Sequence, residues 1–141
     1  MQGNLPTLSA NAFKSLFNTS VHNQINNVSN LVLPFMTLKN SCYVSMFRGL
    51  PIRQAPKLPA TTLAEHCYAQ MFEYTALTTA PILPATNLAQ YCYAWMFRYC
   101  SSLTTTPNLP ATTLAQNCYY YMFGNCVNLT TITSLPATTL A

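Results

Sequence analysis

Apolar residues recur along this chain with a long and regular period. The pair Leu-Pro returns at Leu33, Leu58, Leu83, Leu109 and Leu135, in steps of 25, 25, 26 and 26 residues. Each step repeats a pattern close to LPATTLAxxCYxxMFxxCxxLTTxPx. A fixed period of this length is typical of stacked repeats, in which each repeat buries its apolar face against its neighbours. The pattern therefore predicts a single repeat domain over residues 1–141.

The first copy differs from those that follow. It keeps Leu5-Pro6 but has Ala12-Phe13 and Leu16-Phe17 in place of the Cys-Tyr and Met-Phe pairs. Such divergence is expected of a terminal repeat, which must close the stack against solvent. We expect the repeats at about residues 5–32, 33–57, 58–82, 83–108 and 109–134, with a partial copy at 135–141.

Within each repeat, the apolar residues predict one helix. Counted from Leu63 as position 0, the third copy has apolar residues at positions 0, 1, 4, 5, 8 and 9, which form a broad stripe of helical period. Thr62, followed three residues later by Glu65, has the pattern of a helix capping box. The same arrangement returns in the next two copies, as Asn87 with Gln90 and Thr113 with Gln116.

The rest of each repeat predicts one short strand. Leucine followed by two threonines stands at 77–79, 103–105 and 129–131, and β-branched residues favour strands. The expected fold class is therefore α/β, a leucine-rich-repeat solenoid with one short strand and one helix per repeat of 25–26 residues. The strands would line the concave side and present Thr78, Thr104 and Thr130 there.

These motifs resemble the BspA-like leucine-rich repeats of bacterial surface proteins. The resemblance covers nearly the whole chain and depends on the Ala-Phe or Cys-Tyr/Met-Phe segment followed by Cys-x-x-Leu, as at Cys100–Leu103 and Cys126–Leu129. The LPATTLA variant is similar to arrays in surface proteins of gut Bacteroides and in phage-borne proteins. The chain departs from the family in lacking the usual Ile-x-Ile-Pro strand, and its sequence predicts no anchoring or export segment.

The resemblance implies a non-catalytic adhesion module at the cell surface or outside the cell. Its partner would be a protein or glycan on a host or neighbouring cell. An alternative is a structural or receptor-binding repeat of a phage virion or tail fibre. In either case, the incomplete last repeat would leave an unpaired edge, so self-association through the C-terminal end is also expected.

Charged residues are too few for most kinds of catalytic site. The chain has six Lys or Arg, two acids (Glu65 and Glu73), and two histidines (His22 and His66). General acid–base catalysis and metal binding both need several such groups together, so we expect no enzyme activity, cofactor or metal. The sparse positive charge predicts no nucleic-acid binding. No apolar run approaches ~18 residues, so membrane insertion is not expected.

The six cysteines fall at fixed positions of the repeat. Four lie at position 4 of successive copies, on the predicted apolar stripe, and two lie further along the repeat. Neighbouring helices would be about 8–10 Å apart, too far for disulfide bridges. The sequence therefore predicts buried free thiols at Cys42, Cys67, Cys92, Cys118, Cys100 and Cys126.

Aromatic residues at positions 3, 7 and 11, together with Tyr120 beside Tyr121, form the candidate binding site. If the apolar stripe is buried, these positions face solvent, and a contiguous aromatic patch there would mark an interaction surface. Alternatively, the rings pack on neighbouring repeats and widen the core. The concave threonine surface is a second candidate. The aromatic candidates are Tyr74, Tyr91, Trp95, Tyr99, Tyr120 and Tyr121.

Overall fold

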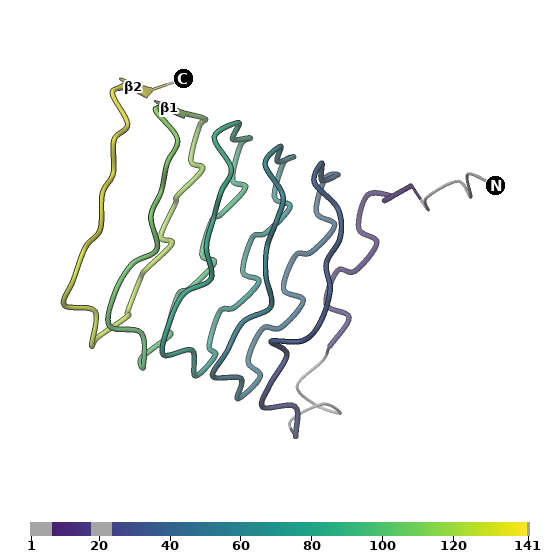
Figure 1. Cartoon of the computed structure of the whole chain (residues 1–141), viewed down its shortest axis with the longest axis vertical. Coiled ribbons are helices and arrows are strands. Elements are labelled where there is room, and N and C mark those ends of the chain that lie inside the picture. The colour runs from purple at the N-terminus through teal and green to yellow at the C-terminus, as the bar shows by residue number, and fades with distance from the viewer. Residues whose placement is uncertain (1–6, 18–23, 141) are drawn as a thin grey trace.

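The chain forms a stack of coils, each made by one repeat. The computed structural model describes residues 7–17 and 24–140, and its coils follow one another side by side from the N-terminal to the C-terminal end (Figure 1). Two strands, β1 (Thr113–Leu114) and β2 (Thr139–Leu140), pair in parallel. Isolated parallel bridges join Thr37 to Thr62, Thr62 to Asn87, and Thr105 to Thr131.

The predicted α/β fold class, with one helix in each repeat, is wrong. The described residues contain no helix, and the segments predicted as helices are runs of tight turns. Tyr91, Trp95 and Tyr99 have φ values of 53°, 54° and 61°, whereas every residue of a right-handed helix has negative φ. The positive φ values recur at positions 3, 7 and 11, at Asn11, Ser15, Ser41, Ser45, Gly49, His66, Gln70, Tyr74, Tyr91, Trp95, Tyr99, Asn117, Tyr121 and Asn125.

Backbone hydrogen bonds explain why turns replace the helix. The N–H groups at odd positions 3 to 11 of a coil donate to the next coil, as from Tyr68 N to Cys92 O at 3.0 Å. Those at even positions close a turn within the coil, as from Ala69 N to His66 O at 3.1 Å. The buried backbone is thus satisfied partly between coils, which a helix would not allow.

The space between coils is that of a sheet and not of packed helices. Coils joined by backbone hydrogen bonds lie about 4.8 Å apart, so the expected helix separation was wrong. At this spacing the aromatic residues of positions 5 and 9 form two continuous ladders. Ring centroids are 5.4–6.0 Å apart in the first ladder and 5.5–5.7 Å apart in the second. The ladders are Phe13–Tyr43–Tyr68–Tyr93–Tyr119 and Phe17–Phe47–Phe72–Phe97–Phe123.

The predicted core positions are confirmed, although the elements that carry them are not. The Cys, Tyr, Met and Phe residues at positions 4, 5, 8 and 9 of coils 58–82 and 83–108 are at most 1% exposed. The predicted capping boxes do not form, because no helix begins at Thr62, Asn87 or Thr113. Thr113 instead begins β1. The predicted strands at 77–79, 103–105 and 129–131 contribute only the bridge between Thr105 and Thr131.

The predicted burial of the six cysteines is also confirmed, and their thiols are free in the structure. The argument that the cysteines lie too far apart to form disulfide bridges fails, because neighbouring coils lie closer together than packed helices would. Burial raises the pKa of Cys92 to about 12 and that of Cys100 to about 11. Cys100 Sγ donates to Phe72 O at 3.1 Å, and Cys126 Sγ donates to Phe97 O at 3.0 Å. These thiols therefore remain protonated near neutral pH and pack as small core residues.

Candidate functional site

The six candidate aromatic residues lie on the side of the coils that faces away from the buried ladders. We call this side the outer face and define it by positions 3, 6, 7, 10 and 11 of the repeat. Tyr74, Tyr120 and Tyr121 are 48%, 44% and 61% exposed. Tyr91, Trp95 and Tyr99 are half-buried. Solvent exposure is thus confirmed fully for three of the candidates and in part for the others.

The backbone of the outer face is strained wherever a large residue has positive φ. Left-handed backbone suits glycine and asparagine, and costs other residues about 1–3 kcal/mol. Gly49, Asn117 and Asn125 are therefore well suited to their positions. Trp95 and Tyr99 are not, and they keep their places at an energetic cost that must be offset by contacts of their side chains.

Four of the candidates form one group, which we call the outer aromatic cluster: Tyr91, Trp95, Tyr120 and Tyr121. Tyr120 contacts the other three edge-on, with ring centroids 6.2 Å from Tyr91, 5.2 Å from Trp95 and 4.9 Å from Tyr121. Its ring plane lies at 87° to that of Trp95. The ring of Tyr120 is therefore nearly perpendicular to the rings of Tyr91 and Trp95.

Tyr91 is held on two sides by neighbouring coils. His66 stacks on it at 5.0 Å, and Asn117 donates from Nδ2 to its hydroxyl at 2.8 Å. Trp95 lies beside it in the same coil, with the ring planes only 7° apart. The half-buried members thus form a fixed base, beside which Tyr120 and Tyr121 remain accessible.

The other two candidates belong to a second group, which we call the arginine–tyrosine stack. The rings of Tyr74 and Tyr99 stack at 4.4 Å with an interplanar angle of 8°. The guanidinium of Arg48 lies over Tyr74 at 5.6 Å, and that of Arg98 lies over Tyr99 at 4.7 Å. Cation–π contacts of this kind stabilise both partners. Because their ring faces are already engaged, these tyrosines present mainly edges and hydroxyls.

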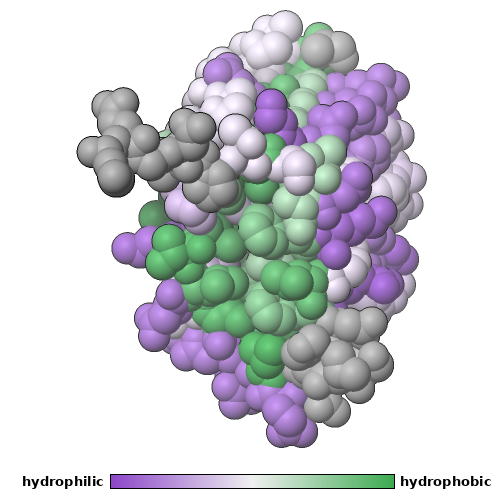
Figure 2. All heavy atoms as spheres, turned by 90° about the vertical axis from the view of Figure 1, so that its right-hand side faces the viewer, coloured by the Kyte–Doolittle hydropathy of each residue, from purple (hydrophilic) through white to green (hydrophobic). Residues whose placement is uncertain are grey.

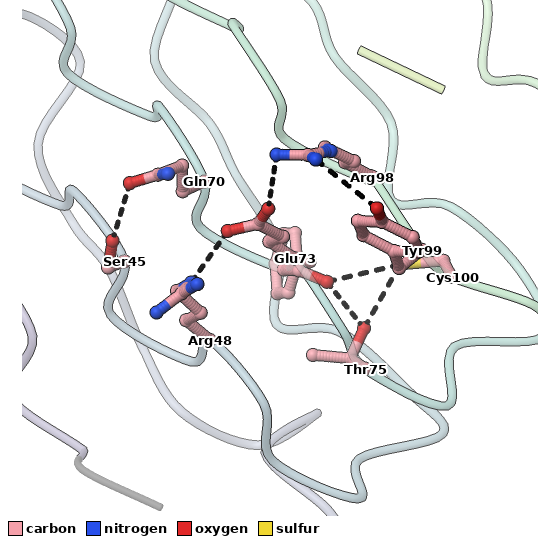
Figure 3. Close-up of polar contacts among 9 residues, drawn as sticks. Ser45, Arg48, Gln70, Glu73, Thr75, Arg98, Tyr99 and Cys100 are labelled. Carbon is pink, nitrogen blue, oxygen red and sulfur yellow. Dashed lines mark hydrogen bonds and ion pairs between the residues drawn. The ribbon is translucent and has the colours of Figure 1, made fainter. Parts of the chain in front are cut away.

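A buried carboxylate fixes both arginines of this stack (Figure 3). Glu73 has a side chain that is only 1% exposed, and its Oε2 accepts from Arg48 Nε at 2.6 Å. Its Oε1 lies 3.4 Å from Arg98 Nη1. Arg98 also donates from Nη2 to the Tyr99 hydroxyl at 3.3 Å. The carboxylate therefore joins three successive coils and positions the cations against the tyrosines.

Sequence reasoning missed this ion triad, although a signal was present. Arg48, Glu73 and Arg98 occupy position 10 of three successive repeats, so their charges alternate along one column. With helix axes about 8–10 Å apart, charges in one column need not be in contact, whereas the spacing of a sheet brings them together. At the spacing of a sheet, opposite charges in neighbouring coils lie close enough to attract each other, so their alternation is favourable.

Both interpretations of the candidate aromatics therefore find support in the packing. The rings do contact neighbouring coils, as the core-widening alternative required, and three of them remain exposed. The second candidate, the threonine surface, has Thr78, Thr104 and Thr130 exposed. Its contacts are weak, with Thr130 Oγ1 lying 3.4 Å from Thr104 O. That either surface binds a partner stays a prediction.

Within residues 7–17 and 24–140, no three His, Cys, Asp or Glu side chains come together in a way that would hold a metal ion. The same residues include no helix long and apolar enough to cross a membrane. Searches of protein-family models, curated proteins and solved structures each find no match to this chain.

Proposed function

We propose that this chain is a non-catalytic binding module, displayed at a bacterial surface, that attaches to a protein or glycan on a host or neighbouring cell. The outer aromatic cluster is its contact surface. The resemblance of the repeats to BspA-like arrays supports surface display. The packing of the outer face supports the choice of contact surface.

The single observation that carries the proposal is the presence of large aromatic residues at left-handed positions. A coil selected only for stability would favour Gly or Asn there, as at Gly49, Asn117 and Asn125. Tyr91, Trp95 and Tyr121 instead have φ values of 53°, 54° and 49°. Strain that persists beside exposed aromatic rings supports a role for the side chains themselves.

The chemistry of the cluster suits a sugar ring or an apolar protein surface. Tyr120 is 44% exposed, and its ring is fixed edge-on by Trp95 and Tyr121. Tyrosine combines an apolar ring with a polar tip and loses little conformational entropy on binding. A prearranged ring of this kind is a good anchor, because little further ordering is needed when a partner arrives.

The charged groups of the described chain support binding rather than acid–base chemistry. Glu73 is enclosed by two arginines, and the other acid, Glu65, lies 3.5 Å from His66 on the surface. His66 in turn is stacked on Tyr91. The groups that could transfer protons therefore contribute to the packing of the outer face.

The test is the substitution Tyr120→Ala, measured by binding to whole bacterial and host cells, matrix proteins and a glycan array. We expect binding to fall at least tenfold, while stability changes by about 1 kcal/mol, since the residue is 44% exposed. Val127→Ala is the matched control, because Val127 is 76% exposed in the same coil but outside the cluster. Equal binding by both variants would contradict the proposal, as would a lack of binding by the unaltered chain.

A further inference from the structure

Arg48 has one edge of its guanidinium engaged within the chain and the other edge free. Its Nε donates to Glu73 Oε2 at 2.6 Å, and its Cζ lies 5.6 Å from the centre of the Tyr74 ring. Neither terminal nitrogen, Nη1 or Nη2, has a partner among residues 7–17 and 24–140, and the side chain is 49% exposed. Because two contacts hold the guanidinium in place, its free edge is a fixed pair of donors.

The residues beside Arg48 add further donors. Ser45, three residues earlier in the same coil, donates from Oγ to Gln70 Oε1 at 3.1 Å (Figure 3). The amide oxygen of Gln70 is thus occupied, and its Nε2 has no partner in the part of the chain that the structure describes. Gly49 is exposed and has no side chain that could cover Arg48. We call Ser45, Arg48, Gln70 and Tyr74 the donor site, because its free groups are mainly hydrogen-bond donors.

The acids of the chain do not fully neutralise this site. The chain has two of them. Glu73 is shared between Arg48 and Arg98, and Glu65 lies 3.5 Å from His66. One carboxylate between two guanidiniums leaves a net positive charge, and Glu73 itself is only 1% exposed. The free edge of an arginine in such a place matches the two oxygens of a carboxylate from outside the chain.

The backbone around the donor site has no free hydrogen-bonding group. In residues 66–75 every N–H donates, either to the next coil or within a turn, and in residues 64–73 every C=O accepts. An extended peptide that adds to a sheet binds through main-chain groups of this kind. The outer face offers it none here, so a ligand must be recognised by side chains.

The outer face changes in character along the stack. Over coil 33–57 its residues at positions 3, 7 and 11 are Ser41, Ser45 and Gly49, whereas the outer aromatic cluster lies over later coils. Viewed from the N-terminal end, apolar residues occupy the centre of the molecule, and hydrophilic residues surround them (Figure 2). A glycan presents both hydroxyl groups and apolar ring faces, so it matches a surface that is polar at one end and aromatic at the other.

We propose that the donor site binds the carboxylate of an acidic glycan whose next sugars reach the outer aromatic cluster. This inference rests on the function proposed above and names its ligand. The carboxylate would accept from Arg48 Nη1 and Nη2, and Gln70 Nε2 would donate to a neighbouring hydroxyl. The coils of Arg48 and Tyr120 are three spacings apart, about 14 Å along the stack at about 4.8 Å per coil. An extended oligosaccharide covers this distance, whereas a single sugar does not.

The first test is a glycan array of carboxylated glycans, containing uronic or sialic acids, each beside its carboxyl-reduced counterpart. We expect the unaltered chain to bind the carboxylated members at least tenfold more tightly, and this binding to weaken as salt is added. Equal binding to the two members of each pair, or binding to neither, overturns the proposal. A poly-glutamate probe separates glycan from peptide, and binding to it as tight as to the best glycan would also contradict the proposal.

Variants of the donor site locate the carboxylate. Arg48→Gln should weaken binding to the best carboxylated glycan at least tenfold. Arg53→Gln is the matched control, because it removes the same charge from an exposed residue outside the outer face. Equal losses from these two variants would refute the assignment. Gln70→Asn leaves the ion triad intact and suits the φ of 57° at this position, and it should weaken binding about threefold.

Thermal unfolding checks that each variant is folded. Should Arg48→Gln fail to fold, unchanged binding by Gln70→Asn overturns the proposal instead. Tyr120→Ala separates this inference from the function on which it rests. Binding that depends on Tyr120 but not on the carboxylate or Arg48 overturns the inference alone, whereas binding that depends on none of them overturns both.

Discussion

The inner and outer sides of each coil share one backbone but differ in how regularly their side chains repeat. On the inner side, Phe17, Phe47, Phe72, Phe97 and Phe123 form a single uninterrupted column. On the outer side, position 7 holds Ser15, Ser45, Gln70, Trp95 and Tyr121 in successive coils. The backbone of the outer side is nevertheless as regular as that of the inner side, since every one of these five residues has positive φ.

This difference indicates that the residues that fold the coil are distinct from the side chains that it exposes. The ladders and the hydrogen bonds between coils fix the backbone, so the outer side chains are free to vary without changing the fold. That freedom has two uses here. One is the ion triad around Glu73, and the other is the outer aromatic cluster.

Removing one ring from an inner ladder should be far more damaging than removing an outer ring two residues away. Phe72 is fully buried and stacks on two neighbours, at 5.6 and 5.7 Å. Phe72→Ala should lower the free energy of unfolding by about 3–5 kcal/mol, because it leaves a cavity in the core. Tyr74→Ala should cost about 1 kcal/mol. Urea unfolding of both variants measures the contrast, and similar losses would show that the division is wrong.

High pH should destabilise the inner side through its thiols. Burial raises the pKa of Cys92 from 9.0 to about 12 in the folded chain. The protonated thiol therefore favours folding fully below pH 9, and this contribution is lost as the pH rises through 12. At pH 10.5, Cys92 alone should reduce stability by about 2 kcal/mol relative to pH 7. Urea unfolding at several pH values measures this, and Cys92→Ala should show a shallower decline. Equal slopes would argue against burial of this thiol.

The ion triad on the outer side should have a smaller effect. Glu73→Gln removes the negative charge but keeps the shape of the side chain, so two arginines lose a charged partner. Buried pairs broken in this way cost more than exposed ones, but Arg48 is 49% exposed and retains access to water. We expect a loss of about 1.5 kcal/mol in thermal or urea unfolding. The loss should change little with added salt, because Glu73 is buried.

The sequence was sufficient to predict the repeat positions that are buried, because the Cys-Tyr and Met-Phe pairs recur in register. The sequence led to the wrong prediction of a helix for the local backbone, because apolar pairs at positions 4–5 and 8–9 fit a helix over two turns. Their spacing is four residues, however, and a helix of 3.6 residues per turn drifts by about 40° at each such step. Gly49, Asn117 and Asn125 at outward positions were a further sign of left-handed turns.

Contacts on the outer face could not be predicted, because they depend on the distance between coils. Position 10 places Arg48, Glu73 and Arg98 in contact only when coils are separated as strands are. The edge-on orientation of Tyr120 depends on the irregular outer positions of three rings around it. No repeat pattern encodes such an arrangement, so the six candidate residues could be predicted, but not their division into two groups or the geometry of either group.

The most direct test of the left-handed turns compares Gly and Ala at Ser41, where φ is 55°. In a helix, Ala would be more stable than Gly by about 1 kcal/mol. In the turn described here, the order reverses, and Ser41→Gly should exceed Ser41→Ala in free energy of unfolding by about 1 kcal/mol. The same pair at Lys39, which is exposed and lacks positive φ, should show no advantage for Gly. If Ser41→Ala is the more stable variant at that site, the turn-built coil is contradicted.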